Sequence, residues 1–312
     1  MSLTSFIKKP DITAGLKERI SRPNISLPKD MICDSPPSYS TYRNLPSLAG
    51  TAADYLIRAG IKLKNPDSRE NQWAATKAIT QLDDLQLDVD TGQWDRVVAF
   101  PGGGEGMVSE EPIPGVDLQL VKDRAKEIYD NARSEYDKTI SSGKLSEGVA
   151  LSLVRLSQLD SIYRAGLRFS LLANPTLCPV DGEEDVAKDI LNLYDHTPWE
   201  NLKSKHHCML NPSFGEASKI VGGADADLVI DNCIIDFKTV KNTTNRFVDT
   251  LHQLAGYFAL SQIGSIDGDQ VDIGSVGIYY CRQATLVNIP IEKLIIGDVK
   301  EFINWFSDMV SG

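Results

Sequence analysis

The stretch GGADADLVIDNCIIDFKTVK, residues 222–241, decides how this chain folds. It predicts two short β-strands joined by a two-residue turn at Asp231–Asn232, because Asp and Asn tolerate the backbone conformations of tight hairpin turns. Counting outward from this turn gives the expected cross-strand pairs. These are Ile230 with Cys233, Leu228 with Ile235, Asp227 with Asp236, and Asp225 with Lys238.

The hairpin is predicted to have one apolar face and one charged face, since successive side chains of a strand point to opposite sides. The apolar face consists of Ala226, Leu228, Ile230, Cys233, Ile235 and Phe237. The charged face consists of Asp225, Asp227, Asp236 and Lys238. Two carboxylates directly opposite each other repel, and a divalent cation between them would remove that cost. The pattern is therefore typical of a metal site with a lysine beside it.

A solvated strand face is the alternative interpretation, in which Asp225 and Lys238 form an exposed ion pair of little energetic value. Two features favour the metal site instead. Asp236 and Lys238 end an otherwise apolar strand, where charges without a partner are costly. Residues 247–260 then predict a helix in which Gln253 and Tyr257, four positions apart, share one face.

The order of these residues resembles the PD-(D/E)xK nuclease superfamily, and within it the RecB-type and lambda-exonuclease-like branch with its Q-x-x-x-Y helix. The matching positions are Asp227, then Asp236-Phe237-Lys238-Thr239, then Gln253-Leu-Ala-Gly-Tyr257, within a resemblance that covers about residues 205–290. It implies that Asp227 and Asp236 bind Mg²⁺ or Mn²⁺ and that Lys238 is the catalytic lysine. It also implies that Gln253 and Tyr257 support the site or contact a phosphate of the substrate.

Divalent metals suit phosphodiester hydrolysis, because hard cations held by carboxylates provide a nucleophilic water and stabilise developing charge. Lys238 could orient that water or deprotonate it, since a neighbouring cation disfavours the charged form of a lysine. A further acidic ligand is expected outside the hairpin. In RecB-type nucleases a G-T-x-x-H segment opens the core, and Gly50-Thr51-Ala-Ala-Asp54 is similar, with Asp54 where the His would stand. Glu216 is the alternative to Asp54, and an ordinary surface Asp is the other interpretation of Asp54.

The resemblance implies an α/β (α+β) fold with a restriction-endonuclease-like core, in which helices flank a small mixed sheet, plus a large helical insertion. The expected regions are an extended, proline-rich N-terminal arm at 1–37, a first core helix region at 38–64, a mostly helical insertion at 65–200 and the nuclease core at 201–312.

Local patterns predict further elements within these regions. Residues 120–140 predict a charged amphipathic helix, and a second helix is expected from an N-cap at Ser146 to Leu172. Residues 272–290 predict a strand, a turn and a strand, and residues 297–310 an amphipathic closing helix. The glycine-rich 101–106, PGGGEG, lacks the Lys-Ser/Thr of a phosphate loop and predicts a flexible loop.

The composition limits the classes of protein to which this chain can belong. At 312 residues, of which 42% are hydrophobic, the chain can form one large domain or two smaller ones. No run of 18 apolar residues occurs, so no membrane span is expected, and the N-terminus has no apolar signal-peptide core. The five cysteines contain no C-x-x-C, which argues against disulfides and zinc sites. Some RecB-type relatives hold an iron–sulfur cluster with four cysteines, three of them near the C-terminus, and only Cys281 lies in that region here, so no cluster is expected. A reducing cytoplasm is the expected compartment.

The formal net charge of −11 is unusual for a nucleic-acid enzyme. Either a local basic groove or a partner subunit could supply affinity for DNA. The basic residues near the hairpin in sequence are Lys203, Lys205, His206, His207, Lys219, Lys241 and Arg246. Each of them could equally be a solvated surface side chain.

These patterns lead to the hypothesis of an Mg²⁺- or Mn²⁺-dependent deoxyribonuclease, exonuclease-like, that acts on single-stranded DNA or duplex ends. Recombination, repair, phage replication and defence are the roles typical of the branch, and a protein partner or a homo-oligomer is compatible with them. The alternatives are a non-catalytic nucleic-acid-binding or scaffold subunit that keeps the fold, and a different metal-dependent hydrolase. The complete set Asp227, Asp236 and Lys238 argues against the non-catalytic subunit.

Overall fold

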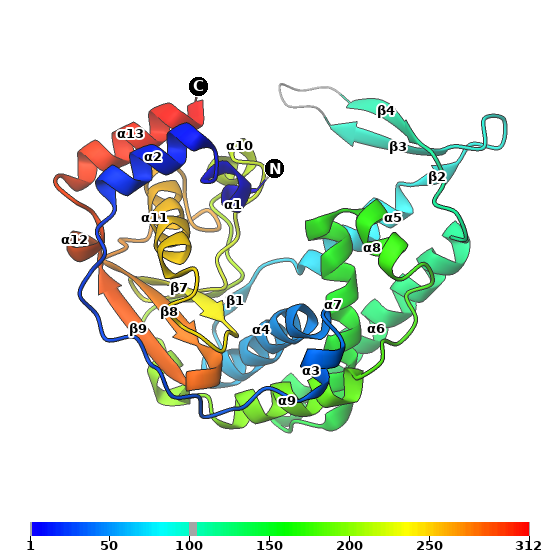
Figure 1. The fold of residues 1–312 in the computed structure, drawn as a ribbon, viewed down its shortest axis with the longest axis horizontal. Coiled ribbons are helices and arrows are strands. Elements are labelled where there is room, and N and C mark those ends of the chain that lie inside the picture. The colour runs from blue at the N-terminus through cyan, green and yellow to red at the C-terminus, as the bar shows by residue number, and fades with distance from the viewer. Residues whose placement is uncertain (1, 100–104, 312) are drawn as a thin grey trace. The chain divides into compact units, whose positions relative to one another are not determined.

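The computed structural model describes residues 2–99 and 105–311 and has a mixed α/β fold (Figure 1). Within these residues there are thirteen α-helices, a mixed sheet of six strands and a second sheet of three strands. The chain forms two compact units. The sheet unit comprises Met1–Ser35, Gly60–Asn71 and Asn192–Gly312, and the helical unit comprises Pro36–Ala59 and Gln72–Leu191. No described helix is both long enough and apolar enough to cross a membrane.

The sheet unit is built on the six-stranded sheet. Its strands are, in spatial order, β1 (Arg69–Glu70), β5 (Cys208–Leu210), β6 (Leu228–Ile230), β7 (Cys233–Lys238), β8 (Ser275–Tyr280) and β9 (Thr285–Pro290). Strand β1 is parallel to β5 and β7 is parallel to β8, whereas the other neighbours are antiparallel. Helix α11 (Phe247–Ile263) makes the crossover that two parallel strands require, from β7 to β8.

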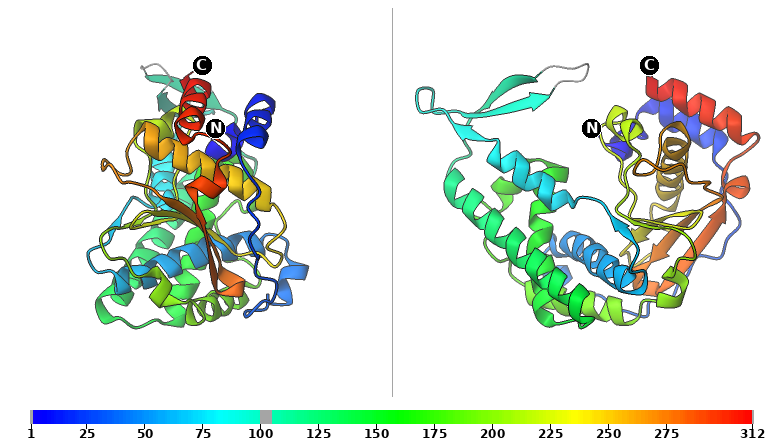
Figure 2. Two further views of the ribbon diagram at one scale, coloured as in Figure 1. Left: turned by 90° about the vertical axis from the view of Figure 1, so that its left-hand side faces the viewer. Right: turned by 180° about the vertical axis from the view of Figure 1, so that it is seen from behind.

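Helix α11 packs on one face of this sheet, and α2 (Pro10–Arg19) and α13 (Val299–Ser311) lie side by side in all views (Figures 1 and 2). The buried cluster joins Ile234 of β7, Leu254 of α11 and Phe306 of α13. The other helices of this unit are α1 (Leu3–Phe6), α10 (Glu216–Ile220), α12 (Ile291–Leu294), and the 3₁₀ turns η1 (Trp199–Leu202) and η2 (Cys281–Gln283).

The N-terminal segment differs from the extended arm that its prolines predict. Residues 3–6 and 10–19 are helical, and Pro10 stands at the first position of α2, where its missing N–H costs nothing. Leu16 is fully buried in the core of the sheet unit. The expectation of an extended arm is wrong for these helices because apolar spacing, rather than proline content, determines their packing.

The helical unit contains most of the remaining helices. They are α3 (Ser38–Thr41), α4 (Leu45–Lys64), α5 (Ala74–Asp83), α6 (Leu118–Ser142), α7 (Glu147–Ala165), α8 (Leu167–Ala173) and α9 (Glu183–Asp195). Helices α4 and α9 each continue into residues that belong to the sheet unit. The two units therefore interleave along the sequence, whereas the predicted regions follow one another.

Local signals explain where the long helices begin and end. The Asp117 carboxylate accepts the Leu120 N–H at the start of α6, and Gly143 ends that helix with a φ of 67°. Ser146 caps α7 as predicted, by accepting the Val149 N–H. The single helix expected up to Leu172 is wrong, because Gly166 adopts a φ of 97° and divides it into α7 and α8.

A three-stranded antiparallel sheet interrupts the region expected to be mostly helical. It has the order β2 (Gln86–Leu87), β3 (Trp94–Ala99) and β4 (Glu105–Glu110). Of the loop expected at 101–106, residues 101–104 lie outside the described residues, and the next two begin β4.

Candidate active site

The β6–β7 hairpin forms with the predicted turn and register. Asp231 occupies the turn with a φ of 50°, and Ile230 pairs with Cys233 and Leu228 with Ile235. The Asp231 carboxylate also accepts the backbone N–H of Lys205, His206 and His207, with the shortest bond, 2.7 Å, to His206. Lys238 is five residues along β7 from Cys233, about 16 Å at the usual rise of a strand. The basic run at 203–207 is therefore held at the far end of the hairpin from Lys238.

The hairpin ladder ends at Leu228, so the expected pairs Asp227–Asp236 and Asp225–Lys238 do not form. Asp225 instead makes an isolated bridge with Ser213. Asp227 keeps a side-chain connection to β7, because its Oδ2 accepts the Phe237 N–H at 2.6 Å. The Asp227 carboxylate thus binds the backbone N–H of Phe237, the residue that lies between Asp236 and Lys238 in the sequence.

Both strands of the hairpin are buried, so the alternative interpretation of a solvated charged face is wrong. Asp236 shares its side of β7 with Ile234 and lies under α11, and only 3% of its surface is exposed. The opposite side carries Phe237, whose ring meets that of Tyr279 edge-on at 5.8 Å. Asp236 is consequently a carboxylate in a core, a position that requires a compensating charge.

Lys238 supplies the positive charge that compensates the buried Asp236 carboxylate. Its Nζ lies 2.6 Å from Asp236 Oδ2, and its side chain is 27% exposed against 4% for Asp236. Burial lowers the pKa of Lys238, but the Asp236 and Asp227 carboxylates outweigh burial and raise the pKa above the usual lysine value. Lys238 is therefore a cation at neutral pH when these two carboxylates are its neighbours.

Helix α11 brings Gln253 and Tyr257 to the same cluster. Lys238 Nζ donates to Gln253 Oε1 at 3.3 Å, and Gln253 Nε2 donates to the Tyr257 hydroxyl at 2.8 Å. The Tyr257 ring stacks on Phe214, with the ring centres 5.4 Å apart. A continuous series of contacts thus runs from Asp236 through Lys238 and Gln253 to Tyr257.

Tyr280 is a neighbour of the cluster that the sequence did not single out. It pairs with Lys238 across the parallel β7–β8 ladder, so both side chains are on the same face. Burial, followed by the Asp236 charge, raises the pKa of Tyr280 to about 12. The Tyr280 hydroxyl donates to the Thr243 carbonyl in the loop after β7. The only sequence signal for this position is its place at the end of a predicted apolar strand, which does not distinguish it from a core residue.

The loop between β7 and α11, residues 239–246, is fixed at several points. Gln283 Nε2 donates to the Val240 and Lys241 carbonyls at 3.2 Å, and the Thr243 hydroxyl donates to the Pro28 carbonyl at 2.7 Å. Arg282, in the 3₁₀ turn after β8, is only 2% exposed. Its guanidinium donates to backbone carbonyls of the N-terminal segment, at Cys33 and Asp34.

The contacts described for the two alternative acidic ligands are with basic residues on their own helices. Glu216 is 83% exposed on the short helix α10 and pairs with Lys219 at 2.6 Å. Asp54 lies on α4 within the helical unit, where its Oδ2 accepts a hydrogen bond from the buried Arg58 at 2.7 Å. Neither contact involves Asp227 or Asp236.

Carboxylates such as those of Asp227 and Asp236 are the type of ligand that Mg²⁺ and Mn²⁺ prefer. Asp236 Oδ2 is enclosed, and no donor among the described residues has the geometry of a hydrogen bond to it. Its contact with Lys238 is an ion pair. Within those residues, no three His, Cys, Asp or Glu side chains form a group able to hold a metal ion. Mg²⁺ is commonly held by one or two carboxylates together with water and substrate phosphates, so two carboxylates suffice for such a site.

No family model, curated protein or solved structure significantly matches this chain.

Proposed function

We propose that this chain is a metal-dependent nuclease that hydrolyses phosphodiester bonds in DNA, in the manner of an exonuclease. The observation that carries the proposal is the buried series Asp236, Lys238, Gln253 and Tyr257, with Asp227 bonded to the amide between Asp236 and Lys238. A structural ion pair would need one carboxylate and one cation. The additional charge of Asp227, which raises the pKa of Lys238, and the Gln253 amide bonded to the Lys238 ammonium support a site organised around substrate.

The arrangement of strands supports a restriction-endonuclease-like core of the PD-(D/E)xK type. The antiparallel hairpin β6–β7 carries the acidic residues, α11 follows it, and β8 returns parallel to β7. Resemblance in motif order and this connectivity are independent observations, since the first uses residue types and the second uses backbone pairing. Fold likeness alone does not establish chemistry, so the proposal depends on the site.

The residues of the site have separable roles in this proposal. Asp227 and Asp236 would hold a divalent cation, which supplies a nucleophilic water at neutral pH and stabilises charge on the phosphate. Lys238 has three N–H donors, of which Gln253 engages one, and its ammonium forms an ion pair with Asp236. A further donor can orient a water or a phosphate oxygen. Gln253, held by Tyr257, fixes the direction of the ammonium, and this preorganisation is what a positioned catalytic group requires.

The test is incubation of the pure protein with end-labelled linear, nicked, circular and single-stranded DNA, each with Mg²⁺, Mn²⁺ or EDTA. Cleavage that requires metal and a free end is the expected result. Asp236→Asn is the matched inactive variant, because it keeps the shape of the side chain and removes the charge. Metal-dependent DNA binding without cleavage by the unaltered protein would identify the non-catalytic subunit instead. Absence of both binding and cleavage on all four substrates would contradict the proposal.

A further inference from the structure

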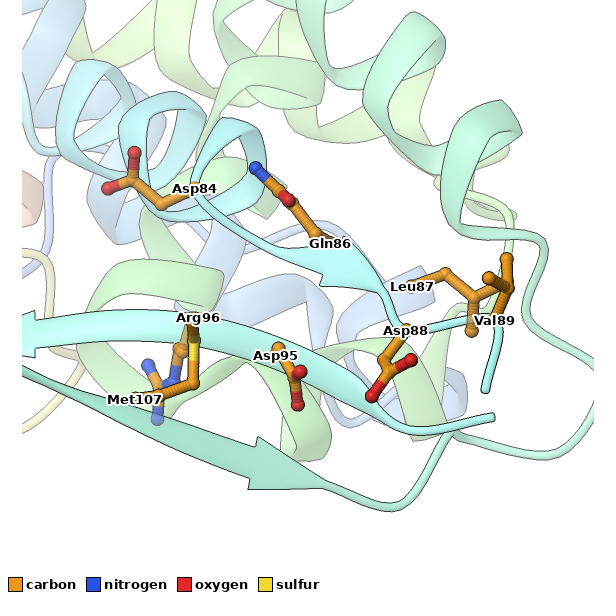
Figure 3. A pocket seen from close by; sticks show the side chains of 8 residues that line it. All are labelled: Asp84, Gln86, Leu87, Asp88, Val89, Asp95, Arg96 and Met107. Carbon is orange, nitrogen blue, oxygen red and sulfur yellow. The ribbon is translucent and has the colours of Figure 1, made fainter. Parts of the chain in front are cut away.

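The acidic character of the chain limits where a strand of DNA can bind. Figure 3 shows a pocket of about 360 Å³ in the helical unit that is lined by Asp84, Asp88 and Asp95. Its Arg96 is paired with Glu110 at 2.7 Å. Such a surface repels phosphate. Because the formal net charge is −11, the chain's own affinity for DNA must come from a local cluster of cations.

Two segments of the sheet unit, the loop 239–246 and residues 17–29, are basic. Together they contain six cations and one carboxylate, that of Glu18, for a net charge of +5. The cations are Lys17, Arg19, Arg22, Lys29, Lys241 and Arg246. Both segments belong to the compact unit that contains Lys238, so they can act together with the candidate active site.

Buried side chains fix the loop 239–246 in place. Gln283 and Thr243 are 2% and 4% exposed, and Gln283 donates to two successive backbone carbonyls of the loop. The Thr243 hydroxyl donates to the Pro28 carbonyl at 2.7 Å, which joins the loop to the N-terminal segment directly before Lys29. The loop is therefore preorganised, and little conformational entropy is lost when its cations bind an anion.

The N-terminal segment also approaches α11. Burial lowers the pKa of His252 on this helix, and Asp249 opposes that effect. The charges of Lys17 and Arg22 lower the same pKa further, which requires both cations to be near His252. Residues 17–29 therefore lie beside α11 as well as beside the loop that precedes it.

The cations of the loop are available to bind an anion. Lys241 and Arg246 are exposed, and neither has a carboxylate partner among the described residues. In contrast, Lys203 and Lys219 are each paired with a glutamate three positions earlier. The loop also has no aromatic side chain on which a base could stack. It therefore suits contacts to phosphates, which do not depend on base sequence.

The distance of the loop from the candidate active site can be expressed in nucleotides. Lys241 follows Lys238 by three residues, and Arg246 precedes Gln253 by seven, which is about 10 Å along α11. Successive phosphates of one B-form strand are about 3.4 Å apart along the helix axis. Arg246 is thus about three nucleotides from the Gln253 end of the site.

We propose that the loop 239–246, together with residues 17–29, binds the sugar-phosphate backbone of a single DNA strand whose end lies in the candidate active site. Lys241 binds the phosphate nearest the site, and Arg246 binds one about three nucleotides away. Binding is independent of base sequence and strongly dependent on salt. This inference rests on the proposed nuclease function for the identity of the ligand.

The experiment measures binding of the full-length protein to a fluorescein-labelled oligothymidylate of about 20 nucleotides, longer than the usual site on one single-strand-binding fold. Fluorescence anisotropy is recorded in EDTA, which prevents metal-dependent cleavage, over a range of NaCl concentrations. The variant Lys241→Gln, Arg246→Gln should bind roughly tenfold or more weakly at low salt. The slope of log K against log salt should fall in magnitude by about 1.4, because each cation on a single strand contributes about 0.7.

Two controls distinguish this surface from general effects of charge or folding. Lys203→Gln, Lys205→Gln removes the same charge at the far end of the hairpin and should leave affinity and slope nearly unchanged. Asp249→Asn removes a repulsive charge from the first turn of α11 and should raise the affinity, which a destabilised fold cannot do. Equal losses in the two double variants, or a slope unchanged in Lys241→Gln, Arg246→Gln, would overturn the proposal.

Cleavage is measured separately, so that this inference and the proposed nuclease can fail independently. With metal, Lys241→Gln, Arg246→Gln should raise KM roughly tenfold, more than it lowers kcat. Metal-dependent cleavage with an unchanged KM in this variant would overturn the surface and leave the nuclease. Loop-dependent binding without any cleavage would support the surface and contradict the nuclease. Absence of DNA binding by the unaltered protein would overturn the surface.

Discussion

At the scale of single residues, three neighbours act on Lys238 with different physical consequences. Asp236 holds its ammonium at 2.6 Å, Gln253 orients it, and the Asp227 charge raises its pKa together with Asp236. An exposed ion pair would contribute at most about 1 kcal/mol to folding. The lysine is instead mostly buried beside two carboxylates, so removal of its side chain exposes the site to electrostatic repulsion as well as to loss of a donor.

Lys238→Ala is expected to lower the rate of DNA cleavage by roughly 10²-fold or more, as for the loss of a positioned proton-transfer group. Metal binding should persist, because Asp227 and Asp236 remain. Asp225→Ala is the control, since Asp225 bridges to Ser213 outside the hairpin ladder. The measurement is the rate of DNA cleavage by each variant at saturating Mn²⁺. Equal small effects of the two substitutions would mean that Lys238 has no catalytic role.

Asp160 provides a pH-dependent prediction within the helical unit. It accepts a 2.6 Å hydrogen bond from the Tyr55 hydroxyl, and burial raises its pKa to about 6, although Arg164 opposes this. Between about pH 4 and pH 6 the folded protein therefore binds more protons than the unfolded chain. The contribution of Asp160 to the free energy of unfolding is fully present below pH 4 and is lost as the pH rises through 6. The total loss is roughly 3 kcal/mol.

Asp160→Asn keeps an acceptor for Tyr55 and removes the titration. The free energy of unfolding, measured with urea, should fall less between pH 4 and pH 7 in this variant than in the unaltered protein. The difference should be roughly the loss of stability attributed to Asp160 above. Asp130→Asn, which is exposed on α6, should retain the original pH dependence. A pH dependence identical in Asp160→Asn and the unaltered protein would show that Asp160 does not titrate in this range.

At the scale of elements, close approach determines which glycines can be replaced. Gly15 lies in α2 against α13, and a Cβ placed there would be 2.2 Å from the Trp305 ring. Gly50 lies in α4 with nothing within 4 Å of such a Cβ. The two residues share a helical backbone, so they differ mainly in the space around them.

Gly15→Ala should destabilise the sheet unit by about 1–3 kcal/mol, because Trp305 must move. Gly50→Ala should stabilise its helix by about 0.5–1 kcal/mol, because alanine restricts the unfolded chain. Thermal unfolding should therefore move in opposite directions for the two variants. A stabilising Gly15→Ala would mean that α2 does not pack closely on α13.

Elements with strong local signals could be predicted from the sequence, and those shaped by distant contacts could not. The Asp231 turn, the Ser146 cap and the helix that carries Gln253 depend on neighbours in sequence, and all three are present as predicted. The two pairs predicted at the open end of the hairpin, Asp227–Asp236 and Asp225–Lys238, do not form. There Asp225 pairs with Ser213, a contact that hairpin counting does not consider.

The same distinction applies within the candidate site. The spacing of Asp236, Lys238, Gln253 and Tyr257 is sufficient to predict that they share a strand face and a helix face. The position of Tyr280 depends on the parallel register of β8, and the burial of Arg282 depends on carbonyls about 250 positions earlier in the chain. Neither property has a local sequence pattern.

At the scale of the whole molecule, the N-terminal helices are part of the core of the sheet unit. Burying one large apolar side chain stabilises a fold by about 1.5–3 kcal/mol, and a typical protein is stable by only about 5–15 kcal/mol. The buried apolar residues of this segment are Leu3, Phe6, Ile7, Ile12, Leu16 and Ile20. Their combined contribution is comparable to the stability of a whole domain.

Deletion of residues 2–20 should therefore abolish cooperative unfolding of the sheet unit, whereas loss of an extended arm would change it little. Differential scanning calorimetry of the full-length and shortened proteins distinguishes these outcomes. The double variant Asp11→Ala, Lys17→Ala is the control, because both side chains are exposed on α2 and its buried residues are untouched. An unchanged transition after the deletion would contradict the packing of α1 and α2.

The interleaving of the two units has a consequence for synthesis on the ribosome. Helix α2 is made well before α13, its partner through Gly15 and Trp305, because 290 positions separate these two residues. At about 5–20 residues per second, the apolar side of α2 waits on the order of 15–60 s for that partner. The helical unit is complete by Leu191 and can fold while α2 is still waiting. The sheet unit, in contrast, cannot close until α13 has been synthesised, and until then the apolar side of α2 lacks this partner.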